Sequence, residues 1–119
     1  MDQDDEETTI EMKTRTEKGE EEVIRVKLPD RKKGEMFAVV DQALGGARMR
    51  VICQDGKVRL GRVKGKYKKR MWIRVGDLLI VQPWEFQDEK CDIIYRYTNT
   101  QAMNLKRRGF LPTHLASLL

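Results

Sequence analysis

The chain has 119 residues, a net charge of +5 and no apolar run approaching the ~18 residues of a transmembrane helix, so its length suits one domain with a modest core. Charged residues make up 36% of the chain, above the roughly 25% usual for globular domains. The acidic N-terminus is unlike a signal peptide and no basic amphipathic helix is evident, so we expect a cytoplasmic protein without a membrane partner.

The charge is unevenly distributed along the chain. Residues 1–22 hold ten acids and three bases, a net of −7, whereas residues 23–74 hold sixteen bases and four acids, a net of +12. The basic region predicts a polyanionic partner, and nucleic acid is the most economical one. Within residues 1–22 only Met1, Ile10 and Met12 are apolar, too few to offset the entropy of ordering the backbone. We therefore expect a disordered, flexible acidic tail there.

The next region, residues 23–97, is expected to form a barrel domain. It begins with a short extended lead-in, after which runs of β-forming residues separated by glycine, proline and polar turns predict five strands. The expected strands cover residues 35–44, 48–54, 58–64, 78–81 and 91–97. The polar stretch at residues 87–90 is expected to be the hairpin loop between the last two strands.

The second and third of these strands are expected to form a hairpin around Asp55-Gly56. This pair is typical of a tight turn in which both residues have positive φ. In the third strand we place Val58 and Leu60 inward and Arg59 outward. The alternation then slips by one residue, so we interpret Gly61 as a bulge that resets the register.

The predicted hairpin places Arg48, Arg50 and Arg59 on one outer face of the sheet. Like charges opposite one another across strands are destabilising, so their presence favours a binding role. The alternative is that they are ordinary solvated arginines, since charged outward faces are common.

A dense basic stretch, residues 64–72, follows the third strand. Its charged and aromatic residues are Lys64, Lys66, Tyr67, Lys68, Lys69, Arg70 and Trp72. Cations at this density repel one another unless they are solvated or face a polyanion, and rings among them can stack on unpaired bases. The alternative is a solvated loop whose Trp72 anchors the next strand in the core.

The chain beyond the last strand is expected to be a helical extension, residues 98–119. Thr98 begins a capping box, and Gly109 marks the end of the helix. A final turn would pack through Leu115 and Leu118.

Catalytic, metal and cofactor sites are not expected. The only histidine, His114, lies near the end of the sequence, and we find no Ser/His/Asp set, metal-ligand cluster or glycine-rich phosphate loop. Cys53 and Cys91 lie in expected strands, and we expect a buried, reduced pair.

The five strands predict an all-β closed barrel, because the third and fourth are joined by neither a tight turn nor a long helix. The OB-fold is the obvious member of this class, and an SH3-like barrel is the alternative on pattern alone. OB-folds usually bind oligonucleotides on strands 2–3 and on the loops between strands 1–2 and 4–5. Because Asp88 and Glu89 make the 4–5 loop acidic, we expect the binding surface to be shifted toward the 3–4 connection.

Several blocks of the sequence resemble one known family. They are residues 45–51, the 55–56 turn, residues 62–73, residues 76–77 and residues 92–97. In order and spacing, over about residues 23–112, these blocks are similar to archaeal translation initiation factor 1A. The resemblance implies an S1-like OB-fold that binds the small ribosomal subunit at the A-site side of the decoding region. There it would contact ribosomal RNA and support initiator tRNA placement and start-codon selection with other initiation factors. We expect a monomer without a cofactor.

The resemblance also suggests which residues bind RNA. The basic loop of the family is matched by Lys66, Lys68, Lys69 and Arg70. Trp72 matches the aromatic residue of the family, which either stacks on a base or supports the loop. Arg62 and Lys64 extend the patch, Arg48, Arg50 and Arg59 broaden it, and Tyr67 is a weaker match. Eukaryotic relatives carry a basic N-terminal tail and a long acidic C-terminal tail. Residues 1–22 of this chain are acidic instead, so we do not transfer the functions of those tails to it.

A general single-stranded RNA chaperone of the cold-shock or S1 type is the alternative function. Such domains place aromatic residues on strands 2 and 3 to stack successive bases. The outward positions of these strands are expected to be arginines, which favours a structured RNA bound through its backbone.

Overall fold

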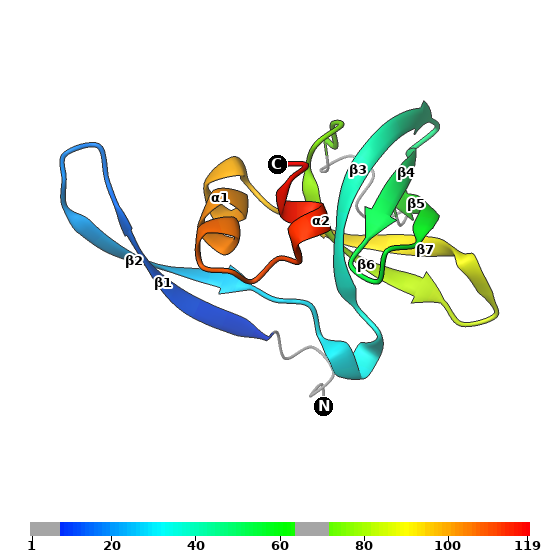
Figure 1. Cartoon of the computed structure of the whole chain (residues 1–119), viewed down its shortest axis with the longest axis horizontal. Coiled ribbons are helices and arrows are strands. Elements are labelled where there is room, and N and C mark those ends of the chain that lie inside the picture. The colour runs from blue at the N-terminus through cyan, green and yellow to red at the C-terminus, as the bar shows by residue number, and fades with distance from the viewer. Residues whose placement is uncertain (1–7, 64–71) are drawn as a thin grey trace.

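The computed structural model describes residues 8–63 and 72–119, which form a hairpin, a β-barrel and two short helices (Figure 1). The strands are β1 (Thr9–Arg15), β2 (Glu21–Lys27), β3 (Met36–Gly45), β4 (Arg48–Cys53), β5 (Val58–Val63), β6 (Leu78–Trp84) and β7 (Gln87–Arg96). The helical elements are the 3-10 turn η2 (Arg31–Lys33), α1 (Asn99–Arg107) and α2 (Thr113–Ala116). In Figure 1, α1 lies between the β1–β2 hairpin and the barrel.

The barrel closes in the order β3-β4-β5-β7-β6, with β6 paired back to β3. Every pairing is antiparallel except that of β5 with β7, the third and fifth barrel strands. A five-stranded closed barrel of this kind is an OB-fold, which confirms the predicted fold class over the SH3-like alternative.

The core has two parts, the barrel interior and a second cluster that includes residues of the β1–β2 hairpin and the helices. The barrel interior holds Val51, Val81 and Ile93 together with Cys53 and Cys91, both fully buried and free of a disulfide, as expected. The pKa of the Cys91 thiol is raised by its contact with the Cys53 thiol and by burial, so Cys91 stays protonated at neutral pH.

The N-terminal region differs from the expected flexible tail. From Thr9 onward it forms β1, which pairs antiparallel with β2. Met12 and Val26 lie on the same face of this hairpin and are fully buried in a second core cluster with Leu105 of α1. The apolar residues of this segment are few, but they share one strand face, so pairing and burial order it. The expected boundary at residue 22 falls inside β2.

The register of β5 also differs from the expectation. Its pairing with β4 runs without a break from Arg48 opposite Arg62 to Ile52 opposite Val58, so Gly61 is not a bulge. Instead Gly61 faces inward, where an added Cβ would lie 3.2 Å from Ile93 Cγ1. The alternation suggested a slip because the apolar Val58 and Leu60 lie on the outer side and the charged Arg59 on the inner side, the reverse of the predicted facing. Val58 is therefore exposed, and Arg59, the next residue of β5, points inward.

The tight-turn geometry expected at Asp55-Gly56 is found instead in the β3–β4 hairpin. Gly46 and Ala47 both have φ of 61°, as in a type I′ turn between β3 and β4. At the predicted Asp55-Gly56 turn, only Gly56 has positive φ, at 87°. The Cys53 N–H donates to the Lys57 carbonyl, so this loop has three residues rather than two.

The β6–β7 hairpin is longer than expected. Residues 87–90, predicted to be a loop, open β7, and the turn lies at Glu85 and Phe86. Lys90 pairs with Leu60 of β5, and Gln87 pairs with Trp84 of β6. Pairing with strands on both sides outweighs the polar local sequence.

The C-terminal helices agree with the sequence in most details. Thr98 and Gln101 form both bonds of a capping box, and the Phe110 N–H donates to the Leu105 carbonyl after Gly109. Leu115 is buried as expected, whereas Leu118 is 44% exposed and does not form the predicted contact.

Candidate nucleic-acid interface

The outer side of β4 and β5 carries three exposed arginines. In β4, Arg48 and Arg50 point outward, while Met49 and Val51 point into the barrel, as predicted. Arg62 of β5 is directly opposite Arg48. We call Arg48, Arg50 and Arg62 the arginine face.

The three arginines of this face differ in their partners. Arg50 forms an ion pair with Asp41 at 2.7 Å, which reduces its availability to an external anion. Within the described part of the chain, neither Arg48 nor Arg62 forms an ion pair. Those two opposed guanidinium groups are therefore the strongest candidates for phosphate contacts on the barrel.

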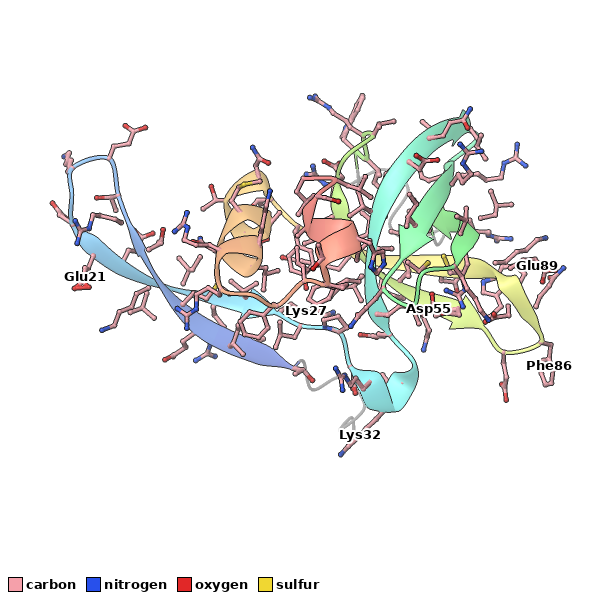
Figure 2. All side chains as sticks on the ribbon, viewed as in Figure 1. Glu21, Lys27, Lys32, Asp55, Phe86 and Glu89 are labelled. Atoms are coloured by element: carbon pink, nitrogen blue, oxygen red, sulfur yellow. The ribbon has the colours of Figure 1, made fainter. Side chains whose placement is uncertain are left out.

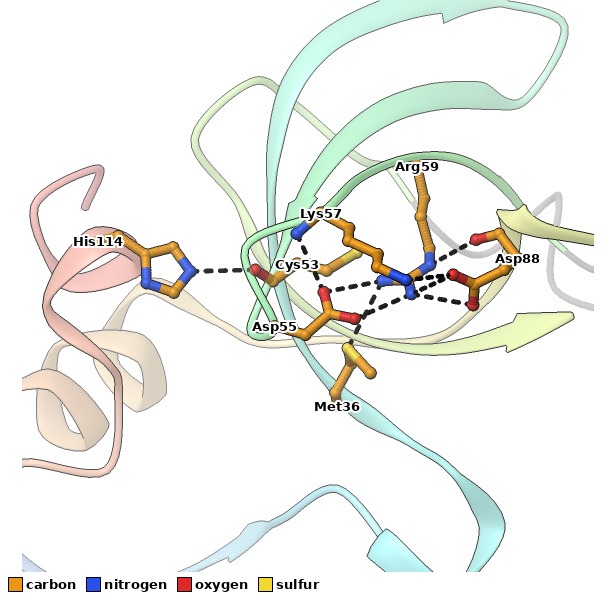
Figure 3. A network of polar contacts seen from close by, with 7 residues as sticks. All are labelled: Met36, Cys53, Asp55, Lys57, Arg59, Asp88 and His114. Carbon is orange, nitrogen blue, oxygen red and sulfur yellow. Dashed lines mark hydrogen bonds and ion pairs between the residues drawn. The ribbon is translucent and has the colours of Figure 1, made fainter.

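Arg59 does not belong to the arginine face, which corrects the prediction. It is 3% exposed, and its guanidinium binds both carboxylate oxygens of Asp55 at 3.0 and 2.9 Å (Figure 3). The same group donates to the Asp88 carboxylate at 3.0 Å and to the Asp88 carbonyl at 2.7 Å. The continuous β4–β5 register turns Arg59 inward, where these partners neutralise it. Its hydrogen bond with Asp55 helps to raise its pKa further above the ordinary value.

This network ties the β4–β5 turn to the start of β7. Lys57 adds an ion pair with Asp88 at 2.9 Å. Hydrogen bonds from Arg59 lower the pKa of Asp55, and hydrogen bonds from Lys57 and then Arg59 lower the pKa of Asp88. Asp88 is thus already neutralised by cations of the protein itself. Of the two acids in the predicted 4–5 loop, Asp88 and Glu89, Asp88 is therefore not expected to repel RNA.

Trp72 is 77% exposed, so the interpretation that it anchors the next strand in the core is wrong. It lies at the edge of a hollow of about 570 Å³ between the chain leading into β6 and helix α1. Val75 and Leu118, both exposed, also line this hollow. Whether Trp72 stacks on a base stays a prediction.

The central part of the predicted site lies outside the described residues. It consists of Lys64, Lys66, Tyr67, Lys68, Lys69 and Arg70. The described chain resumes at Trp72, after β5 has ended at Val63 beside Arg62 of the arginine face. The roles of these six residues stay predictions.

Sequence reasoning missed two residues next to the arginine face, Trp84 and Lys90. The Lys90 ammonium lies 5.4 Å from the centre of the Trp84 ring, and the Arg62 guanidinium lies 5.7 Å from it. The Trp84 ring nitrogen donates to Asp92 at 3.1 Å. Polar Lys90 and Asp92 alternate with apolar Cys91 and Ile93, and this pattern could have placed Lys90 on the outer side of a strand. The interpretation of residues 87–90 as a loop obscured it.

Neither a metal site nor a membrane-spanning helix is found among the described residues. There, no group of three or more His, Cys, Asp and Glu residues is placed to hold a metal ion. None of the described helices is long and apolar enough to span a membrane.

Comparison with known proteins gives consistent matches. A family model described as translation initiation factor 1A / IF-1 matches residues 23–118. Translation initiation factor 1A of Thermoplasma acidophilum is 49% identical over 112 residues, covering 94% of each chain. The factor of the same name from Thermococcus kodakarensis is 61% identical over 90 residues, covering 75% of this chain and 77% of its own. A solution structure of a translation initiation factor from the Wolbachia endosymbiont of Brugia malayi matches with a TM-score of 0.43 and 26% identity, over 56% of this chain and 79% of that one.

Proposed function

The chain belongs to the translation initiation factor 1A family, and from this premise we propose that it binds the small ribosomal subunit near the A site through contacts with ribosomal RNA. In that position it supports initiator tRNA binding and start-codon selection, together with other initiation factors. It acts in the cytoplasm as a monomer, by binding rather than by catalysis.

The observation that carries this proposal is the pair of opposed arginines on the barrel. Arg48 and Arg62 face each other across β4 and β5, both exposed. Such a pair destabilises the sheet on its own, and a phosphate between or beside the two guanidinium groups relieves the repulsion. The basic residues of 64–71 follow directly after β5 and add five further cations next to this pair in the sequence.

The pattern favours structured RNA bound through its backbone. The outward positions of β4 and β5 hold Arg48, Arg50 and Arg62 together with aliphatic residues, and none of them holds the stacking ring that a single-strand chaperone would carry there. Trp72, highly exposed, supplies one ring directly after the basic stretch in the sequence and suits a single unpaired base rather than a run of bases.

The test measures binding to purified small ribosomal subunits over a range of salt concentrations. Neutralising Lys66, Lys68, Lys69 and Arg70 to Gln is expected to weaken binding strongly at low salt. It is also expected to lower the log–log salt slope by about three, at roughly 0.7–0.9 per phosphate contact. A matched control neutralises four exposed cations of the β1–β2 hairpin and α1, namely Lys13, Lys18, Arg25 and Lys106.

The control variant is expected to keep the wild-type slope. Equal binding by the wild type and the loop variant at every salt concentration would refute the proposal. Footprinting on the bound subunit adds the location, with protection expected at the decoding region. Diffuse protection, with equal affinity for an unstructured oligonucleotide, would instead support the single-strand chaperone.

A further inference from the structure

We propose that Arg62, Trp84 and Lys90 form a second phosphate-binding patch on the β6–β7 side of the barrel, with Trp84 positioning the two cations. This inference rests on the proposed function and extends it, because it continues the RNA-binding surface from β4 across β5 to β7. We call these three residues the Trp84 patch. The sequence had indicated a surface shifted away from this hairpin.

The register of the barrel places the patch next to the arginine face. Arg62 stands between Arg48 on β4 and Asp92 on β7. Lys90 is two residues before Asp92 and points to the same outer side, because Cys91 between them is fully buried. A phosphate backbone that follows Arg48 and Arg62 therefore reaches Lys90 without leaving this side of the barrel.

The Trp84 ring gives the two cations a defined place before RNA arrives. Both charged groups lie within about 6 Å of the ring centre, the range of a cation–π contact. The ring itself is oriented by the hydrogen bond from its nitrogen to Asp92. Lysine and arginine lose much rotamer freedom when they bind a ligand, so cations held in advance bind with a smaller loss.

The acids of the hairpin leave this patch positively charged. Asp88 is bound by Arg59 and Lys57. Asp92, opposite Arg62, accepts from the neutral Trp84 ring and keeps its negative charge, but it is one acid against the two cations of the patch. Glu89 is exposed toward the end of the hairpin, where Figure 2 shows it near Phe86 and away from the helices. Trp84 also lines a hollow of about 760 Å³, whose charged lining residues are Lys32, Lys33, Glu85 and Asp92. A phosphate group at the patch is thus met by the cations of β5 and β7, Arg62 and Lys90.

The first experiment removes the charges. Arg62→Gln/Lys90→Gln is compared with Lys13→Gln/Lys106→Gln, which removes the same charge from exposed residues of β1 and α1. Binding to purified small subunits is measured by anisotropy of protein labelled at its N-terminus, between about 50 and 300 mM salt. The patch variant is expected to lower the salt slope by about 1.4–1.8, and the control to leave it unchanged.

The second experiment tests the positioning role of Trp84. Trp84→Leu keeps both cations but removes the ring, and it is expected to weaken subunit binding several-fold. Trp84→Phe keeps an aromatic ring and is expected to restore most of that loss. Thermal midpoints are measured alongside, and a role confined to folding would show as lost stability in Leu and Phe variants alike without this difference in affinity.

The outcomes separate this inference from the proposed function. If Arg62→Gln alone lowers the salt slope as much as Arg62→Gln/Lys90→Gln does, Lys90 makes no phosphate contact, so the Trp84 patch is refuted and the proposed function stands. If the wild type itself does not bind small subunits, both are refuted. Equal affinities of the two Trp84 variants would refute the positioning role.

Discussion

At the scale of single residues, the position of Arg59 shows that an arginine on an OB-fold strand need not face RNA. Its side chain is almost fully buried, and two aspartates from separate elements bind it. A buried ion pair adds little net stability compared with apolar packing, but breaking one leaves polar groups without partners and is costly. Arg59 thus has a structural role, whereas Arg48 and Arg62 are available to an external anion.

The two kinds of arginine are expected to respond in opposite ways to substitution. Arg59→Met should lower the free energy of unfolding by about 1–3 kcal/mol, because Asp55 and Asp88 lose their shared partner. It should leave the salt slope of subunit binding unchanged. Arg48→Met should keep the stability within about 0.5 kcal/mol and lower the slope by roughly 0.7–0.9. Urea denaturation and salt-dependent binding measure the two effects, and a reduced slope for Arg59→Met would place that guanidinium on RNA.

The same network predicts a loss of stability in acid. The pKa values of Asp55 and Asp88 are lowered in the folded protein, so the unfolded state takes up protons first as the pH falls. Their contribution is complete above the unfolded value of about 3.9 and is lost as the pH falls through the lower folded values. Thermal midpoints measured from about pH 6 to pH 2.5 should fall steeply below about pH 4. The variant Asp55→Asn/Asp88→Asn should have a lower thermal midpoint at pH 6 and should lose less of it in acid. If its midpoint falls as much as that of the wild type, other carboxylates cause the loss of stability.

At the scale of elements, local sequence was sufficient where a strand or helix carries its own signal. The alternation of β4 gave its facing, and the Thr98 cap with Gly109 gave the limits of α1. Local sequence was insufficient where a residue far away in the chain determines the conformation or the facing of a side chain. The inward position of Arg59 depends on Asp88, 29 residues later, and β1 is ordered through pairing with β2 and burial against α1. In the site, the exposed Arg48 and Arg50 were predicted, whereas the contact of Lys90 with Trp84 depends on the β6–β7 register.

The β1–β2 hairpin is expected to be part of the cooperative fold. Met12 is 1% exposed and packs in the cluster that joins the hairpin to the barrel and helices. Met12→Ala should therefore lower the free energy of unfolding by about 2–5 kcal/mol, the range for large-to-small changes in a core. Lys13→Ala, the exposed neighbour on β1, is the matched control and should change it by less than about 0.5 kcal/mol. Equal urea midpoints for the two variants would show that residues 9–15 do not pack.

At the scale of the whole molecule, opposite charges lie at different places. The β1–β2 hairpin as a whole holds five acids and five bases over residues 9–27, but its tip, residues 16–22, is acidic. The tip carries Glu17, Glu20, Glu21 and Glu22, all exposed, against the single base Lys18. Figure 2 shows Glu21 on the far side of α1 from the β6–β7 hairpin. The principal extents of 46 × 38 × 28 Å are several times the ~8 Å Debye length at physiological salt, so the tip of the hairpin is expected to act on a polyanion at the arginine face mainly at low salt. This arrangement is expected to direct the basic side of the molecule toward a polyanion and to turn the acidic tip of the hairpin away from it.

Removing that acidic end should therefore change the rate of association more than the bound complex. Replacing Glu17, Glu20, Glu21 and Glu22 by Gln is expected to raise the association rate with small subunits about two- to tenfold near 50 mM salt, because the long-range repulsion is lost. The gain should vanish near 0.5 M salt, where the Debye length is only ~4 Å, and the dissociation rate should stay constant because these residues lie away from the arginine face. Stopped-flow measurements at both salt concentrations supply these rates. A slower dissociation at high salt would mean that the hairpin itself contacts the subunit, and a faster one would mean that its glutamates bind a basic protein surface there.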